Sequence, residues 1–156
     1  MMEMHIDGLD RVSVSFLQLQ QLSKDQIWDI IAPAADTLKT RMQDVISRLF
    51  TQHSGSLRES IHVERKISKG GVVYAQVGPD QQKHPKATQG KRKRNAQGGG
   101  GGKYAGTNAE VGWILEYGST RIPAKHWMET ACNEAEEELH EQLEAGWDAA
   151  VTAAGL

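Results

Sequence analysis

The stretch Val111–Met128, VGWILEYGSTRIPAKHWM, decides how this chain folds, because it combines an apolar run with a carboxylate, a glycine and a proline. Its apolar residues predict a buried cluster: Trp113, Ile114, Leu115 and Tyr117. Gly118 ends this element, since glycine takes a left-handed cap without steric cost. Pro123 is tolerated in the first turn of a helix, so it can start the helical pattern that follows from Lys125. We therefore expect a corner between two elements and no catalytic loop.

Glu116 is the unusual residue of this stretch, because it is a carboxylate between Leu115 and Tyr117. A carboxylate that is buried needs a partner. The candidate donors are Arg121, Lys125 and the backbone amides at the start of the last helix. Glu116 can brace the corner at Gly118 or contact a partner protein directly, and bracing is the favoured role.

The segment from about Lys125 to about Ala149 predicts the last helix. One stripe is apolar: Trp127, Ala131, Ala135, Leu139, Leu143 and Trp147. The outer face is acidic: Glu129, Glu134, Glu137, Glu141 and Glu144. Glutamates at helical spacing are the ordinary solvated face of a helix, which we favour over a metal site or an acid/base pair.

A second long helix is predicted in the N-terminal half. Ser23 and Gln26 form a capping-box pattern, and apolar residues then recur at steps of three and four. The helix would span about 27 residues and about 40 Å, and Pro33 predicts a kink or a split near Ile30–Ala32. The preceding Leu9–Leu22 fits a helix or a strand, and we take a helix.

The apolar pattern changes to a period of two at residue 61. Four residues fall on one face of a strand: Ile61, Val63, Arg65 and Ile67. Ser68–Gly71 can turn the chain into a second strand, Val72–Val77, and Gly78–Pro79 ends it. We expect an antiparallel hairpin with one face in water.

Residues Asp80–Asn108 show no periodicity, almost no apolar content and five consecutive glycines at Gly98–Gly102. Such a segment cannot offset its ordering entropy by burial, so we expect a mobile insertion loop of roughly thirty residues. It carries a basic run: Lys91, Arg92, Lys93 and Arg94. The run can contact DNA phosphates, dock on an acidic neighbour, or simply keep the loop in solution.

Charge is distributed unevenly along the chain. The formal net charge is −2, yet seven Lys or Arg and no acid lie between Gln81 and Ala109. From Glu110 to Leu156 there are ten acids against two basic residues. This bipolar pattern suggests that charged surfaces meet charged neighbours.

Length and composition predict a single domain over residues 1–156 of the 156-residue chain. The single Cys132 has no internal disulfide partner, which points to a reducing compartment. We expect no leader peptide and no membrane span, since no apolar run approaches about 20 residues. The elements together predict an α+β fold: a small antiparallel sheet packed against the long helix and the last helix, with a short helix or strand at Val111–Tyr117.

No pattern of catalytic or cofactor-binding residues is convincing. Gly98–Lys103 lacks the first glycine and the hydroxyl residue of a phosphate-binding loop. His53 lies near several serines, but no third group orients a nucleophile, and a turn rich in capping residues is the favoured interpretation. We therefore predict a protein that is not an enzyme and has no cofactor or metal, and a small hydrolase or nuclease ranks last.

Two motifs resemble those of a known family. Ser54–Ile61, SGSLRESI, is similar to "T-G-x-L-R-x-S-I", and Glu116–Met128 is similar to "E-F-G-T … P-A-x-P-F-(L/M)". These motifs occur, in this order, in the small neck or tail-completion proteins of long-tailed phages. The resemblance covers roughly residues 5 to 145. His126 and Trp127 stand where the family has proline and phenylalanine, and the loop before the second motif is unusually long and basic.

The resemblance implies a structural virion protein that assembles in the bacterial cytoplasm. It would form a ring, sixfold or alternatively twelvefold, between the head-side connector and the tail tube or tail terminator, around passing DNA. The implied corner and subunit contact residues are these: Glu116, Tyr117, Gly118, Thr120, Pro123 and Trp127. The alternative function is a nucleic-acid-binding module that uses the basic loop, residues 83–103.

Overall fold

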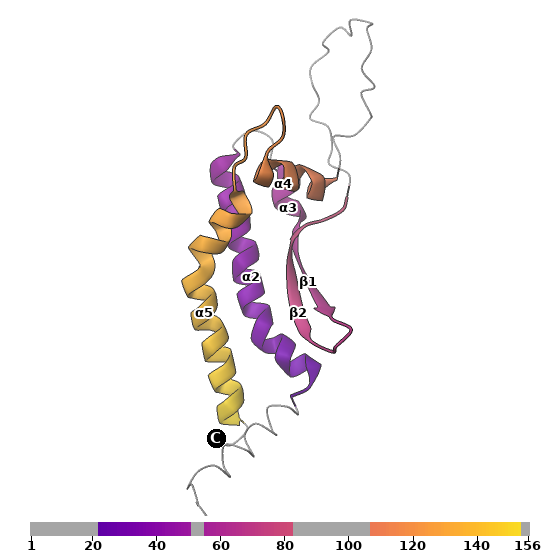
Figure 1. Ribbon diagram of the computed structural model, residues 1–156. Helices are drawn as coiled ribbons and strands as arrows, with labels where there is room; N and C mark the ends of the chain where they lie inside the picture. The colour runs from indigo at the N-terminus through magenta and orange to yellow at the C-terminus, as the bar shows by residue number, and fades with distance from the viewer. Residues whose placement is uncertain (1–21, 51–54, 83–106, 154–156) are drawn as a thin grey trace, which may run out of the picture.

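A computed structural model of the chain describes residues 22–50, 55–82 and 107–153. The elements, in order, are α2 (Lys24–Leu49), α3 (Gly55–Ser60), β1 (Ile61–Ile67), β2 (Val73–Pro79), α4 (Asn108–Tyr117) and α5 (Trp127–Ala153). The two long helices α2 and α5 run side by side, and the β1–β2 hairpin lies on the other side of α2 (Figure 1). The predicted α+β fold is confirmed.

Helix α2 begins as its sequence predicts. The Ser23 hydroxyl accepts from the Gln26 amide at 3.2 Å, and the Gln26 side chain accepts from the Ser23 amide at 2.9 Å. The helix is continuous across Pro33, so it is not split. Its first turns incline toward the hairpin in Figure 1, as a bend at the proline would produce. The helix expected at Leu9–Leu22 lies outside the described residues, apart from Leu22.

Strands β1 and β2 pair antiparallel from Ile61↔Pro79 to Ile67↔Val73. The turn is closed by the Ser68 amide, which donates to the Val72 oxygen at 2.9 Å, so Val72 belongs to the turn and not, as predicted, to the strand. The strand continues through Gly78 to Pro79, past its predicted end at Val77, because both residues still pair with β1. On the face toward α2, Arg65 pairs with Asp25 at 2.7 Å and lies over the Trp28 ring.

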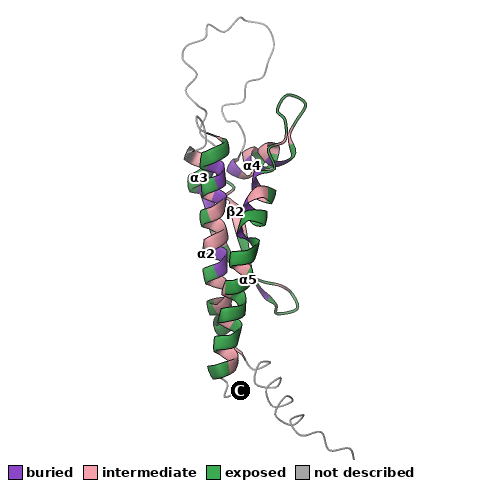
Figure 2. Cartoon of the chain, turned by 90° about the vertical axis from the view of Figure 1, so that its left-hand side faces the viewer, coloured by how far each residue is buried: buried purple, intermediate pink, exposed green. Residues whose placement is uncertain are grey.

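The core is formed by residues from α2, α3, β1 and α5: Met42, Val45, Ile46, Leu57, Ile61, Trp127 and Ala131. Most buried positions lie toward the end of the molecule that carries α3 and α4 (Figure 2). The predicted stripe of α5 is buried in its first half but not in its second, where Leu143 is 38% and Trp147 is 46% exposed. The two long helices are also linked on the surface, where Arg48 pairs with Glu134 at 2.6 Å. Glu134, which was expected on the outer face, therefore faces α2.

Helix α5 begins at Trp127, two residues later than predicted, and Pro123 precedes it without starting it. The reason is His126, whose φ of +47° is incompatible with a right-handed helix. The predicted loop Asp80–Asn108 is also shorter at its end, because Asn108 already belongs to α4.

Candidate functional site: the corner between α4 and α5

Gly118 forms the corner in the way its sequence predicts. Its φ is +81°, and its amide donates to the Ile114 oxygen at 2.7 Å to close α4. A Cβ at this position would lie 2.8 Å from the Ala124 backbone nitrogen, closer than real contacts allow. Glycine is required here because of the positive φ and because the backbone of Ile122 and Ala124 passes close to Gly118.

Glu116 is buried at 4% exposure and binds the first turn of α5. Its two carboxylate oxygens accept from the Met128 amide at 2.6 Å and from the Glu129 amide at 3.2 Å. These amides are among the unpaired donors at a helix start, where the helix dipole favours a negative charge. Of the three donors considered from the sequence, the structure selects the backbone amides.

The backbone on either side of Glu116 strengthens this link. The Lys125 amide donates to the backbone oxygen of Leu115 at 2.8 Å, and the His126 amide donates to the backbone oxygen of Glu116 at 3.3 Å. The last turn of α4 and the start of α5 are thus held together by main-chain and side-chain bonds. All of these bonds lie within one copy of the chain.

Trp127 is the apolar anchor of the corner. It is fully buried, and its indole Nε1 donates to the Gly112 oxygen at 2.9 Å. A Cβ on Gly112 would lie 3.3 Å from the Trp127 ring, so the glycine lets α4 approach the ring closely. Trp127, the first residue of the predicted apolar stripe, therefore lies in the core.

The predicted burial of Trp113 and Tyr117 is wrong. Trp113 is 61% exposed and Tyr117 is 59% exposed. Their rings lie against each other with centroids 4.4 Å apart. The physical reason is that α4 buries its other side, formed by Asn108, Gly112 and Glu116 at intervals of four residues. Polar and small residues meet the core here because their hydrogen bonds are satisfied within it.

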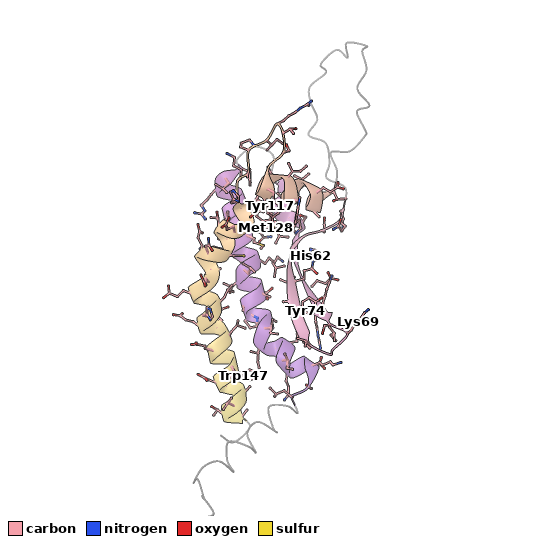
Figure 3. The ribbon with its side chains drawn as sticks, in the orientation of Figure 1. His62, Lys69, Tyr74, Tyr117, Met128 and Trp147 are labelled. Carbon is pink, nitrogen blue, oxygen red and sulfur yellow. The ribbon has the colours of Figure 1, made fainter. Side chains whose placement is uncertain are left out.

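The exposed apolar side chains of the corner are referred to below as the aromatic face, defined as Trp113, Tyr117 and Ile122, the last 41% exposed. Figure 3 shows Tyr117 at the corner and Trp147 near the opposite end of α5. Two other predicted corner residues, Thr120 and Pro123, are exposed in the connecting segment. The six predicted corner residues therefore divide into an internal group, Glu116, Gly118 and Trp127, and an outward group.

A cluster of polar residues was missed by sequence reasoning. Asn108 is buried at 4% exposure and links three segments. Its Nδ2 donates to Asp80 Oδ1 at 2.8 Å, its backbone amide donates to the Gln82 oxygen at 2.8 Å, and its Oδ1 accepts from the Ser56 hydroxyl at 3.2 Å. The bonds of Asn108 therefore hold it close to Asp80 and Gln82, which lie far from it in the sequence.

The overlooked signal was a second capping box. The Thr107 hydroxyl accepts from the Glu110 amide at 3.2 Å, and the Glu110 carboxylate accepts from the Thr107 amide at 2.8 Å. This T-x-x-E pattern predicts a helix start at residue 108. The basic run of Lys91, Arg92, Lys93 and Arg94 lies outside the described residues.

Within the described ranges, Glu116, His126 and Glu129 form a group of metal-ligating types, with one ligand atom each within 4.8 Å of the others. His126 Nδ1 lies 3.3 Å from Glu129 Oε2, and both side chains are more than half exposed. Both oxygens of Glu116 already bind backbone amides. Helix capping therefore accounts for the position of Glu116 without a metal ion.

Three titratable groups near the helix pair have shifted pKa values. A hydrogen bond from Arg48 lowers the pKa of Glu134, and the same contact raises the pKa of Arg48. Burial, followed by the nearby charge of Glu116, raises the pKa of the Cys132 thiol.

None of the described helices is both long and apolar enough to span a membrane.

Comparisons with protein-family models, with curated proteins and with solved structures each found no match to this chain.

Proposed function

We propose that this protein is a structural subunit of the virion neck of a long-tailed phage, where it joins the head-side connector to the tail by assembling into a ring. The first support is the pair of motifs at Ser54–Ile61 and Glu116–Met128. In the fold the described parts of both motifs contribute to one core, since Leu57 and Ile61 of the first pack with Trp127 of the second. The two motifs therefore act as one structural unit.

The observation that carries the proposal is the aromatic face. Trp113 and Tyr117 are adjacent, large and more than half exposed. Exposed clusters of this kind are typical of protein–protein contacts, where Trp and Tyr are enriched among the few residues that contribute most of the binding energy. Because Glu116 and Trp127 brace the corner from inside, this face is available to a partner without any rearrangement.

In this proposal the mechanism is association. The aromatic face provides an apolar contact to a neighbouring subunit of the neck. The bipolar charge pattern of the chain favours neighbours of complementary charge and sets their orientation. Copies that contact one another through two different surfaces close into a ring when the rotation between neighbours completes a full turn, and a sixfold ring, or a twelvefold ring that matches the head side, fits this position.

The test is electron microscopy of particles made with and without this gene in the phage or prophage that carries it. We expect its deletion to leave DNA-filled heads and separate tails, or tails of irregular length, and a plasmid copy of the gene to restore joined virions. Normal, infectious and fully joined virions from the deletion strain would contradict the neck role.

A second candidate function, nucleic-acid binding, is favoured by one observation. The bonds of Asn108 to Asp80 and Gln82 hold together the two ends of a segment that carries all the basic residues between Gln81 and Ala109. This function predicts salt-dependent affinity for DNA that falls when Lys91, Arg92, Lys93 and Arg94 are changed to glutamine. DNA affinity at physiological salt that survives these changes would contradict it.

A further inference from the structure

The hairpin is a sheet of only two strands, each seven residues long, among the residues that the structure describes. One face of it packs on α2, but no described strand pairs with the outer edge of β1 or of β2. Two-stranded sheets are marginal on their own, and a free edge is a template for another strand. Within the part of the chain that the structure describes, both edges of the hairpin are therefore unpaired.

The register identifies the free backbone groups. The bonds from Ser68 to Val72 and from Asp80 to Ser60 fix the bonded pairs at the two ends of the hairpin. Bonded and non-bonded pairs alternate between these ends. The N–H and C=O groups of the alternate residues therefore point outward: Ile61, Val63, Arg65 and Ile67 on β1, and Val73, Ala75 and Val77 on β2.

The two edges differ in charge. Strand β1 carries Glu64, Arg65 and Lys66, whereas β2 has the sequence VYAQVGP and no charge. Charged side chains on an edge strand hinder its pairing with an identical edge of another copy, and β2 has no charged side chain. If β1 of one copy pairs with β2 of the next, each charge of β1 faces an uncharged strand in every register.

We propose that copies of this chain join edge to edge, with β1 of one copy paired antiparallel to β2 of the next. Rotation about a ring axis keeps all strands antiparallel, and a closed ring leaves no free edge. A two-fold pair of β2 strands would leave both β1 edges open. The inference rests on the ring of the proposed function and specifies the contact that closes it.

Two proline variants test the pairing in purified protein. Val63→Pro removes an outward N–H from β1, and Ala75→Pro removes one from β2. Neither N–H is used inside the hairpin, and edge positions of this kind tolerate proline. Circular dichroism and thermal melting of each variant verify the fold, and native mass spectrometry reads the oligomer.

The wild-type chain should form a closed oligomer, and each variant alone should be monomeric. Mixed in equal amounts, the variants should form a one-to-one dimer, because one retains its β2 edge and the other its β1 edge. Dimers of Val63→Pro alone would overturn the proposal in favour of β2–β2 pairing. A ring that persists in both variants would overturn strand pairing altogether.

Amide hydrogen exchange of the wild-type chain provides a test that needs no variant. The outward amides of Val63 and Ala75 should be protected in the oligomer and should exchange freely on dilution to the monomer. Protection in the monomer would mean that the chain covers its own edges, and free exchange in the oligomer would mean that the edges are unused. Either result overturns the strand pairing without bearing on the neck role, which the gene deletion tests separately.

Discussion

The two ends of the helix pair α2–α5 contain similar residues but bury them very differently. At the corner, Trp127 is fully buried, whereas near the other end of the same helix Trp147 is 46% exposed. The difference comes from the elements that cover each end of the helix pair. Glu116 and Gly118 fold α4 back onto the start of α5, and no comparable element of the described chain covers Trp147. In the described part of the chain, burial along α5 therefore follows the backbone closure at the corner more than the apolar pattern of the helix.

The largest expected effect comes from removing each tryptophan in turn. Trp127→Ala should lower the free energy of unfolding by about 3–5 kcal/mol, because it creates a cavity and leaves the Gly112 oxygen without its donor. Trp147→Ala should cost less than about 1 kcal/mol, since the side chain is half in water. Urea unfolding followed by circular dichroism measures both values. Equal losses of unfolding free energy in the two variants would show that the two tryptophans are equally buried in solution.

Removal of the Glu116 carboxylate should have the next largest effect. Glu116→Ala leaves the Met128 and Glu129 amides without their acceptor and should cost about 2–3 kcal/mol. Glu129→Ala is the matched control, because its exposed side chain can be lost while its amide remains. Thermal melting compares the two. A Glu116→Ala variant with unchanged melting temperature and unchanged assembly would remove the bracing role.

Glycine substitutions compare the two ends at the level of the backbone. Gly118→Ala should cost about 2 kcal/mol, because it combines a left-handed φ with an overlap on Ala124. Gly146→Ala gains helix propensity but places a Cβ 3.0 Å from Ile30 Cγ2, so the two effects nearly cancel, to within about 1 kcal/mol. Urea midpoints at constant m-value give the comparison. A larger loss of stability for Gly146→Ala than for Gly118→Ala would contradict the conclusion that the corner is the more tightly packed end.

The smallest expected effect is a dependence on pH from the Arg48–Glu134 pair. The pKa of Glu134 is lowered in the folded state, so its contribution to stability is present above the ordinary glutamate pKa of about 4.3 and is lost as pH falls through the folded pKa. Glu134→Gln should therefore be less stable than wild type at neutral pH, and the two should converge in acid. A difference that stays constant from neutral to acid pH would show that the charge of Glu134 is not responsible.

Much of the fold could be predicted from local patterns. The capping box at Ser23, the change of period at Ile61 and the break at Gly118 each have a local cause, and each is confirmed. Glu116 was identified because a carboxylate in an apolar run requires a partner. The exposure of Trp113 and Tyr117 could not be predicted, because it depends on which side of α4 meets the core. That choice is made by Gly112 and Asn108 through contacts with residues distant in the sequence.

The aromatic face can be tested most directly in the assembled phage, because the proposed function depends on it. A phage carrying the double change Trp113→Ser and Tyr117→Ser would be examined by electron microscopy beside the gene deletion and a Trp147→Ser control. Since both side chains are exposed, the double variant should fold with a near wild-type melting temperature, yet it should leave separate heads and tails as the deletion does. The control should give joined virions. Joined, infectious virions from the stable double variant would contradict the claim that this face contacts a neighbouring subunit of the neck.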